Sequence, residues 1–247
     1  MAQRALFLVV DSPAPHAGEW FAGLLPRARH GRLTSTTLSD ATAHLRNRCF
    51  LDAVRSERIL CVVGDEWSRH LPRVFRGVFV SPRRRGWKVF PAKCRDRIER
   101  LLQNTPATDR TPPATRRLDA AAQLMLNEPW DFFSLWLSLS DAGLAPAGEQ
   151  VKELVNRLTP DIAVCAVLLS ESSGCRWLLR TQSGGGEVLP PRPIEDVLPT
   201  LLGVVGVTVP SALPGKPLDL NAAGKPSGYT AEEEREIQKR LEDLGYL

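Results

Sequence analysis

The chain has 247 residues, of which 43% are hydrophobic and 24% are charged, and its formal net charge is +4. This composition is typical of a globular protein and excludes a disordered, collagen-like or disulfide-stapled chain. The first apolar run, Ala5 to Val10, is too short to cross a membrane or to form the core of a signal peptide, so we expect a cytoplasmic protein with no membrane association.

The first half of the chain reads as strands alternating with helices. Ala5–Val10 is a continuous apolar run, typical of a strand buried on both faces, and it ends in Asp11. An amphipathic segment follows over 16–25. We then expect a short strand within 32–39, a helix over 40–55 that begins at Asp40, and strands over 59–63 and 77–80.

The second half continues the same alternation. The expected elements are a basic helix over 93–103, a loop or insertion near 104–115, a helix over 116–127, a strand over 130–141, a helix over 151–158, a strand over 161–174, a flexible connection over 181–193 and a helix over 194–206. A Thr-x-x-Glu capping box, Thr230 and Glu233, begins a last helix.

This order of elements predicts an α/β fold, a three-layer α/β/α sandwich with a mostly parallel central sheet of about six to eight strands. We assign residues 1–220 to one domain and residues 221–247 to a linker and a C-terminal capping helix of the same domain. In such sheets ligands bind at the carboxyl ends of the strands. Asp11, Asp141 and Glu171 all lie where a predicted strand ends.

The segment 194–218 carries the most specific motif. It resembles the D-x-x-P-T…G…P…L-x-G-x-x-L segment near the end of sulfatases, type I phosphodiesterases and nucleotide pyrophosphatases. The matching residues are Asp196, Pro199, Thr200, Gly206, Pro210, Leu213, Gly215 and Leu218. The ending GYTAEEEREIQKRLEDLGYL is similar to the tail of bacterial members. The chain is thus identified as a truncated and degenerate member of the alkaline phosphatase superfamily, on the phosphodiesterase and sulfatase side.

The resemblance implies an alkaline-phosphatase-like fold and a site for two divalent metals. LFLVVDSPAP resembles the first strand, with Asp11 as a metal ligand, and EPWDFFSLWLSLSD resembles the strand that delivers Asp141. Glu171 stands for the aspartate of the S-D-H-G motif. LLPRARHGRLTST resembles the stretch that leads to the nucleophile, for which Thr42 is our nearest candidate.

The histidines that this chemistry needs are missing from the matching positions. Ala145 stands where the D-x-x-x-H motif has its imidazole, Ser172 stands for the histidine of S-D-H-G, and none of the four histidines follows His70. The carboxylates that remain, Asp11, Asp141 and Glu171, suit Mg²⁺ or Mn²⁺ better than zinc if they bind a cation at all. The simpler interpretation is that they are strand-end acids facing solvent.

Three functions follow as hypotheses. The first is a catalytically inactive homologue without a cofactor, a pseudoenzyme that has lost metal binding and binds a phosphorylated small ligand or a protein partner in the old phosphate cleft. The second is a divergent metal-dependent phosphoester or sulfate-ester hydrolase. The third is a nucleic-acid-associated protein, since Arg83, Arg84, Arg85 and Lys88 open a basic stretch over 83–100; a solvated arginine-rich surface is the favoured interpretation of that stretch.

Overall fold

The computed structural model describes residues 4–25, 28–35, 37–64, 77–82, 87–103, 113–182 and 186–219. The chain divides into two units, residues 1–217 and 218–247, and all described helices and strands belong to the first. The expected linker and capping helix over 221–247 lie outside the described residues. In the described part of the chain, no helix is both long and apolar enough to cross a bilayer.

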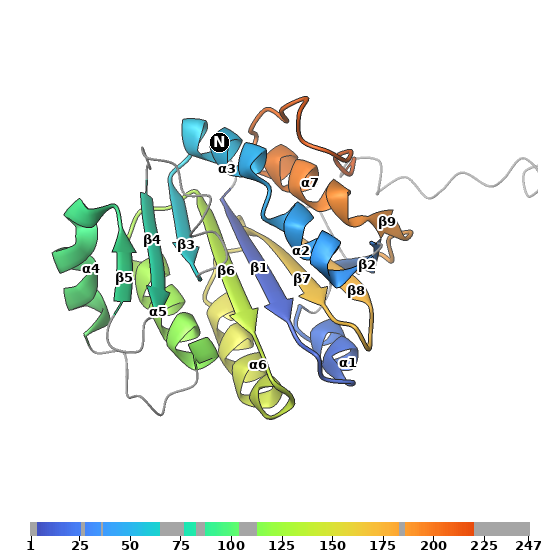
Figure 1. Ribbon diagram of the computed structural model, residues 1–247, viewed down its shortest axis with the longest axis horizontal. Coiled ribbons are helices and arrows are strands. Elements are labelled where there is room, and N and C mark those ends of the chain that lie inside the picture. The colour runs from blue at the N-terminus through green and yellow to red at the C-terminus, as the bar shows by residue number, and fades with distance from the viewer. Residues whose placement is uncertain are drawn as a thin grey trace, which may run out of the picture. The chain divides into compact units, whose positions relative to one another are not determined.

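The centre of the larger unit is a sheet whose described residues form nine strands in the order β5-β4-β3-β6-β1-β7-β8-β2-β9 (Figure 1). The strands are β1 (Ala5–Asp11), β2 (Arg29–Thr34), β3 (Leu60–Val63), β4 (Gly77–Pro82), β5 (Trp87–Phe90), β6 (Phe132–Ser138), β7 (Ala163–Leu169), β8 (Cys175–Arg180) and β9 (Arg192–Pro193). Five of the eight strand pairs are parallel, so the sheet is mostly parallel as expected.

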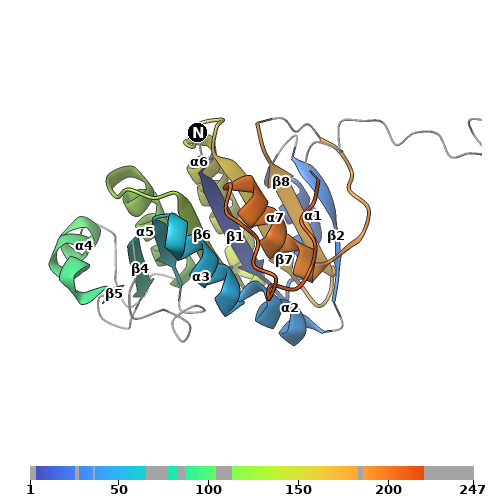
Figure 2. The ribbon, with the colours of Figure 1, turned by 90° about the horizontal axis from the view of Figure 1, so that it is seen from above.

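The helices follow the strands in the order that the sequence predicts. They are α1 (Ala17–Ala22), α2 (Leu38–Leu45), α3 (Arg48–Glu57), the short 3-10 helix η1 (Ala92–Cys94), α4 (Arg95–Leu102), α5 (Pro113–Asn127), α6 (Asp141–Asn156), the 3-10 helix η2 (Ile194–Asp196) and α7 (Val197–Val204). In Figure 2, α2 and α3 lie on one side of the sheet and α5 and α6 lie on the other.

The two faces of β1 pack against different helices because side chains alternate along a strand. Leu6, Leu8 and Val10 belong to a core cluster with α1, α5 and α6. Phe7 lies on the opposite face, where its ring centroid is 6.4 Å from that of Phe132, which in turn is 5.4 Å from that of Phe50 in α3. Even-numbered residues of β1 therefore pack on the side of α1, α5 and α6, and odd-numbered residues pack on the side of α3.

The expected helix over 40–55 is wrong in one respect, because two helices occupy this segment. Asp40 is not the N-cap of the first; Thr37 is, and its Oγ1 accepts a hydrogen bond from the Asp40 backbone N–H at 3.0 Å. The break comes at Asn47, whose side chain caps α3 by accepting a bond from the Cys49 N–H at 2.8 Å. Both caps are the Thr and Asn type that satisfies the first unpaired backbone N–H groups of a helix.

Two further elements differ from the sequence expectation. The helix α6 begins at Asp141 rather than near residue 151, although Pro146 lies inside it. The strand β8 was not expected, and it runs antiparallel to β7 after the turn at Gly174, whose φ of 71° is left-handed.

Candidate functional site

Asp11 is the last residue of β1, where the carboxyl ends of the parallel strands meet. It lies in register with Ser138 of β6 and with Leu169 of β7. Burial raises the pKa of the Asp11 carboxyl above its ordinary value; the Arg46 guanidinium opposes this shift and the Glu171 carboxylate adds to it. The Asp11 carboxyl thus lies within electrostatic reach of both the Arg46 guanidinium and the Glu171 carboxylate.

Asp141 has a different partner. It opens α6, and its Oδ1 lies 2.9 Å from Nε2 of His16, which precedes α1. Both side chains are more than half exposed. This ion pair joins the loop after β1 to the start of α6.

The three acids do not gather at one point. Asp11 has the same parity as Phe7 and therefore points to the α2–α3 side, whereas Asp141 begins a helix on the opposite side. In the part of the chain that the structure describes, no three His, Cys, Asp or Glu side chains group closely enough to hold a metal ion. As placed, the three acids together do not form the metal site that the resemblance implies, and the role of each as a ligand stays a prediction.

The positions that lack histidine have structural contacts or face solvent. Ala145 is exposed, one turn along α6 from Asp141. The Ser172 hydroxyl donates a hydrogen bond to the Ala14 carbonyl at 3.1 Å and lies 3.1 Å from the Ser170 hydroxyl. Ser172 thus ties the turn after β7 to the loop after β1.

Thr42, the candidate nucleophile, is half-buried in the interior of α2. The hydroxyl at the start of that helix belongs to Thr37, which bonds both the backbone N–H and the carboxylate of Asp40. No described contact activates Thr42, and its assignment as nucleophile stays a prediction.

A cavity of about 260 Å³ lies at the carboxyl end of β6, and we name it the β6 pocket. It is lined by the first turns of two helices and by the residues between β6 and α6: Pro113, Ala114, Arg117, Ser138, Leu139, Ser140 and Gly143. Arg117 is buried, and its Nη1 donates to the Trp136 carbonyl at 2.7 Å. The sequence did not indicate these residues. The one available signal is Ser140, which directly precedes α6, and the apolar pattern did not predict a helix that begins there.

The Ser140 side chain makes no capping hydrogen bond at the start of α6. The first turn of a helix presents unpaired backbone N–H groups and the positive end of the helix dipole. In the β6 pocket the first turns of α5 and α6 lie beside a guanidinium. Pro113 has no N–H to offer, and the Gly143 N–H already donates to the Ser140 carbonyl at 2.9 Å, so the helix dipoles and the guanidinium are the features that favour an anion there.

The basic stretch is described only in part. Arg83, Arg84 and Arg85 lie outside the described residues. The Lys88 ammonium is 5.8 Å from the centroid of the Phe79 ring, a cation–π arrangement. Arg97 forms an ion pair with the buried Glu128 at 2.8 Å. Lys88 and Arg97 thus interact with the protein, and the nucleic-acid role of the stretch stays a prediction.

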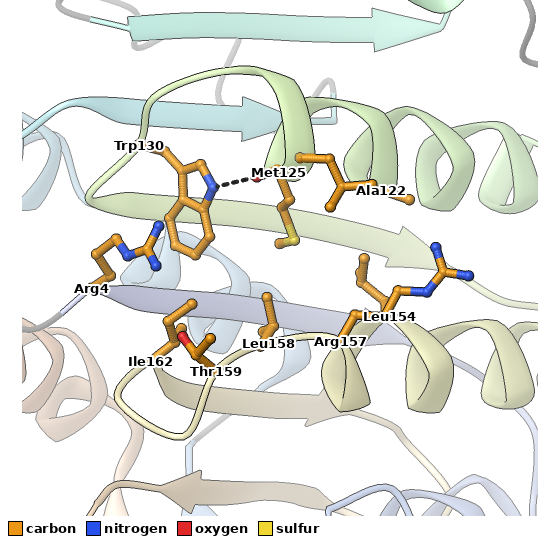
Figure 3. Close-up of a pocket in the computed structure, with 10 residues that line it drawn as sticks. Arg4, Ala122, Met125, Trp130, Leu154, Arg157, Leu158, Thr159 and Ile162 are labelled. Atoms are coloured by element: carbon orange, nitrogen blue, oxygen red, sulfur yellow. Dashed lines mark hydrogen bonds between the residues drawn. The ribbon is translucent and has the colours of Figure 1, made fainter.

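Another cavity, of about 120 Å³, opens near the amino end of β1 between α5 and α6 (Figure 3). Figure 3 shows Trp130 and Arg4 at one end, with Met125 and Leu158 between them and Arg157. The Arg4 guanidinium lies 5.0 Å from the Trp130 ring centroid. This cavity lies away from the carboxyl ends of the strands.

Asp196, the first residue of the most specific motif, makes its described contacts with other residues of the chain. Its carboxylate is nearly buried, binds Arg192 at 2.8 Å and accepts the Lys216 backbone N–H at 2.8 Å, and its backbone carbonyl accepts the Thr200 hydroxyl at 2.7 Å. Gly215 packs against the Glu195 backbone, where a side chain would collide. These contacts explain why the motif needs these residue types.

No family model matches the sequence, and no curated protein matches it. The structure is similar to that of a phosphonate monoester hydrolase from Silicibacter pomeroyi, with a TM-score of 0.55, 11% sequence identity, and coverage of 92% of this chain and 78% of that chain. At this identity the likeness concerns the fold alone, a mixed α/β fold with a large and mostly parallel central sheet.

Proposed function

We propose that this chain is a binding protein with an alkaline-phosphatase-like fold, of the sandwich type, which holds a phosphate-bearing small ligand in the β6 pocket and does not hydrolyse it. The observation that carries the proposal is the pocket itself, where Arg117 and the first turns of α5 and α6 meet at the carboxyl end of β6. This is the edge at which parallel α/β sheets bind ligands.

The chemistry of the pocket suits a phosphate or phosphonate group. The positive end of a helix dipole favours an anion, and a guanidinium adds a charge-assisted hydrogen bond. The Arg117 guanidinium is positioned by its bond to the Trp136 carbonyl. Leu139 and Pro113 provide an apolar wall for the organic part of the ligand. The similar structure is that of a phosphonate monoester hydrolase, and phosphonate monoesters belong to the same chemical class.

The positions of the remaining acids support the proposal that the ligand is not hydrolysed. Asp141 is paired with His16, and Asp11 lies on the other side of the sheet. The groups at two imidazole positions, Ala145 and Ser172, cannot bind a metal as histidine does. Ser172 instead holds two loops of the edge together.

The test is isothermal titration calorimetry with phenyl phosphate in the presence of EDTA. Ser140→Asp replaces one good N-cap residue by another and places a carboxylate at the pocket, so the variant should fold normally and bind at least about tenfold more weakly. Ser56→Asp, on the exposed side of α3, is the matched control and should bind like the wild type. Absence of binding, or equal binding by both variants, would contradict the proposal.

A divergent hydrolase is the second candidate, and one observation favours it. Asp11 and Glu171 interact through their charges, and a carboxylate pair of this kind is a candidate for holding Mg²⁺ or Mn²⁺. Calorimetry with MnCl₂ tests it: Asp11→Asn and Glu171→Gln should each abolish binding if the pair holds the ion. Binding that survives both substitutions would rule out this pair.

A further inference from the structure

A cavity of about 280 Å³ lies beside β2 and β8, and we name it the β2–β8 cavity. Phe21 of α1 and Leu178 of β8 line it and are nearly fully buried. Val188, which is 70% exposed, and Leu189 border it from the segment that precedes β9. Its volume is close to the lower end of small-molecule sites, roughly 300 to 1,000 Å³.

Two arginines face each other at this cavity. The strands β2 and β8 are antiparallel, with Arg32 directly opposite Arg176 and His30 directly opposite Leu178. Directly opposite residues project from the same face of the sheet, and like charges in this arrangement are destabilising. The strand pair thus concentrates positive charge on the face that also carries the apolar lining.

No described group neutralises this charge. Within the described residues, neither the Arg32 nor the Arg176 guanidinium has a carboxylate at ion-pair distance, and Arg176 Nε donates only to the Ser173 carbonyl, at 3.4 Å. The Arg176 guanidinium also packs against Gly18 of α1, which leaves room for it because glycine has no side chain. Arg176 is therefore positioned, whereas Arg32 is exposed.

We infer that the β2–β8 cavity binds a small carboxylate with an apolar body, with the carboxylate between Arg32 and Arg176 and the body against Phe21 and Leu178. An anion there offsets the repulsion between two opposed guanidinium groups, each of which can bind a carboxylate through two parallel hydrogen bonds. The apolar lining supplies affinity for the rest of the molecule. This site is separate from the β6 pocket, and its test is independent of the proposed function.

The experiment is isothermal titration calorimetry of the full chain with 2-naphthoate and with its neutral isostere 2-naphthamide. The two probes share the apolar rings and differ in the charge, so the amide should bind at least about tenfold more weakly. Arg32→Gln and Arg176→Gln should each weaken 2-naphthoate binding by a similar factor and leave the weak 2-naphthamide binding unchanged.

Two further variants complete the test. Val188→Glu places a carboxylate at the rim without removing an arginine and should also weaken 2-naphthoate binding. Arg157→Gln removes an arginine from the cavity of Figure 3 and should have no effect. The inference is overturned if 2-naphthoate does not bind, if both probes bind equally, if Val188→Glu binds like the wild type, or if only Arg157→Gln weakens binding.

Discussion

Two regions of the sheet differ in whether their charged side chains have partners of opposite charge. They are the carboxyl edge of β1, β6 and β7 and the face of β2 and β8. At the edge, Asp141 has His16 as a partner and Ser172 bonds the Ala14 carbonyl. At the β2–β8 cavity, Arg32 and Arg176 oppose each other without a described carboxylate. A charge with an oppositely charged partner in the chain stabilises the fold, and the opposed pair of arginines is the observation on which the inferred carboxylate site rests.

The contact between α1 and α6 supports the edge and gives the largest expected effect. Gly148 of α6 lies against the rigid indole of Trp20, so an added methyl group would collide with it. We expect Gly148→Ala to lower the free energy of unfolding by about 2 kcal/mol, as overpacking does. Chemical denaturation measures it.

Gly203→Ala in α7 is the matched control, because an added methyl group there meets nothing within 4 Å. The better helix propensity of alanine should raise the free energy of unfolding by about 0.5 to 1 kcal/mol. If both variants gain stability, the close approach of α1 to α6 is not a determinant of the edge.

Asp11 should give the edge a pH dependence. Because its pKa is raised in the folded state, the unfolded chain binds fewer protons above pH about 4, and stability falls as the pH rises through the folded pKa. Asp11→Asn should remove this loss of stability. The free energy of unfolding of Asp11→Asn minus that of the wild type should therefore increase from pH about 4 to the folded pKa and stay constant above it. Denaturation at a series of pH values measures the difference.

The neighbours of Asp11 sharpen this expectation. Glu171→Gln should lower the pKa of Asp11 and reduce the pH dependence, whereas Arg46→Gln should raise the pKa and increase it. If the difference in free energy of unfolding between Asp11→Asn and the wild type is constant with pH, the pKa of Asp11 is the same in the folded and the unfolded chain.

The His16–Asp141 ion pair should contribute less, because both side chains are exposed. A double-mutant cycle with His16→Ala and Asp141→Ala should give a coupling of about 0.5 kcal/mol at pH 6 that declines with added salt. A coupling of zero at low salt would show that the pair does not join the two loops.

The smallest effect is expected at the β2–β8 cavity, and it has the opposite sign. Without ligand, Arg32→Gln should raise the free energy of unfolding by about 0.3 kcal/mol because it relieves the repulsion from Arg176. The exposed Arg95→Gln on α4 serves as the control for a general change of net charge. A loss of stability on Arg32→Gln would remove the contrast between the two regions.

The sequence predicted the elements whose apolar pattern is continuous. The runs that became β1, β3, β4, β6 and β7 are all apolar and lie in the middle of the sheet, where both faces are covered. The pattern failed where tertiary contacts decide. Two of the six residues of β8 are arginines, so its apolar run is only three residues long. The helix α6 continues through Pro146, whose missing N–H costs only the bond to the Ala142 carbonyl near the helix start.

Of the proposed site, the sequence indicates only the edge of the sheet. The acids at strand ends indicated the carboxyl edge, and the parity of Asp11 explains why they do not meet. Arg117 was not predicted to be a site residue. It lies in α5, 19 residues before Trp136, and no pattern in the sequence indicates its hydrogen bond to the Trp136 carbonyl. The contacts of Asp196, the first residue of the most specific motif, are with other parts of the chain, which the motif alone does not indicate.

The central claim is that the fold binds a phosphate-bearing ligand without hydrolysing it. The most direct measurement is the rate of p-nitrophenyl phenylphosphonate hydrolysis by metal-free protein and by protein supplied with Mg²⁺, Mn²⁺ or Zn²⁺, for the wild type and Asp11→Asn. We expect only the background rate of buffer and cation, identical for both proteins. Cation-dependent turnover by the wild type that Asp11→Asn abolishes would contradict the claim.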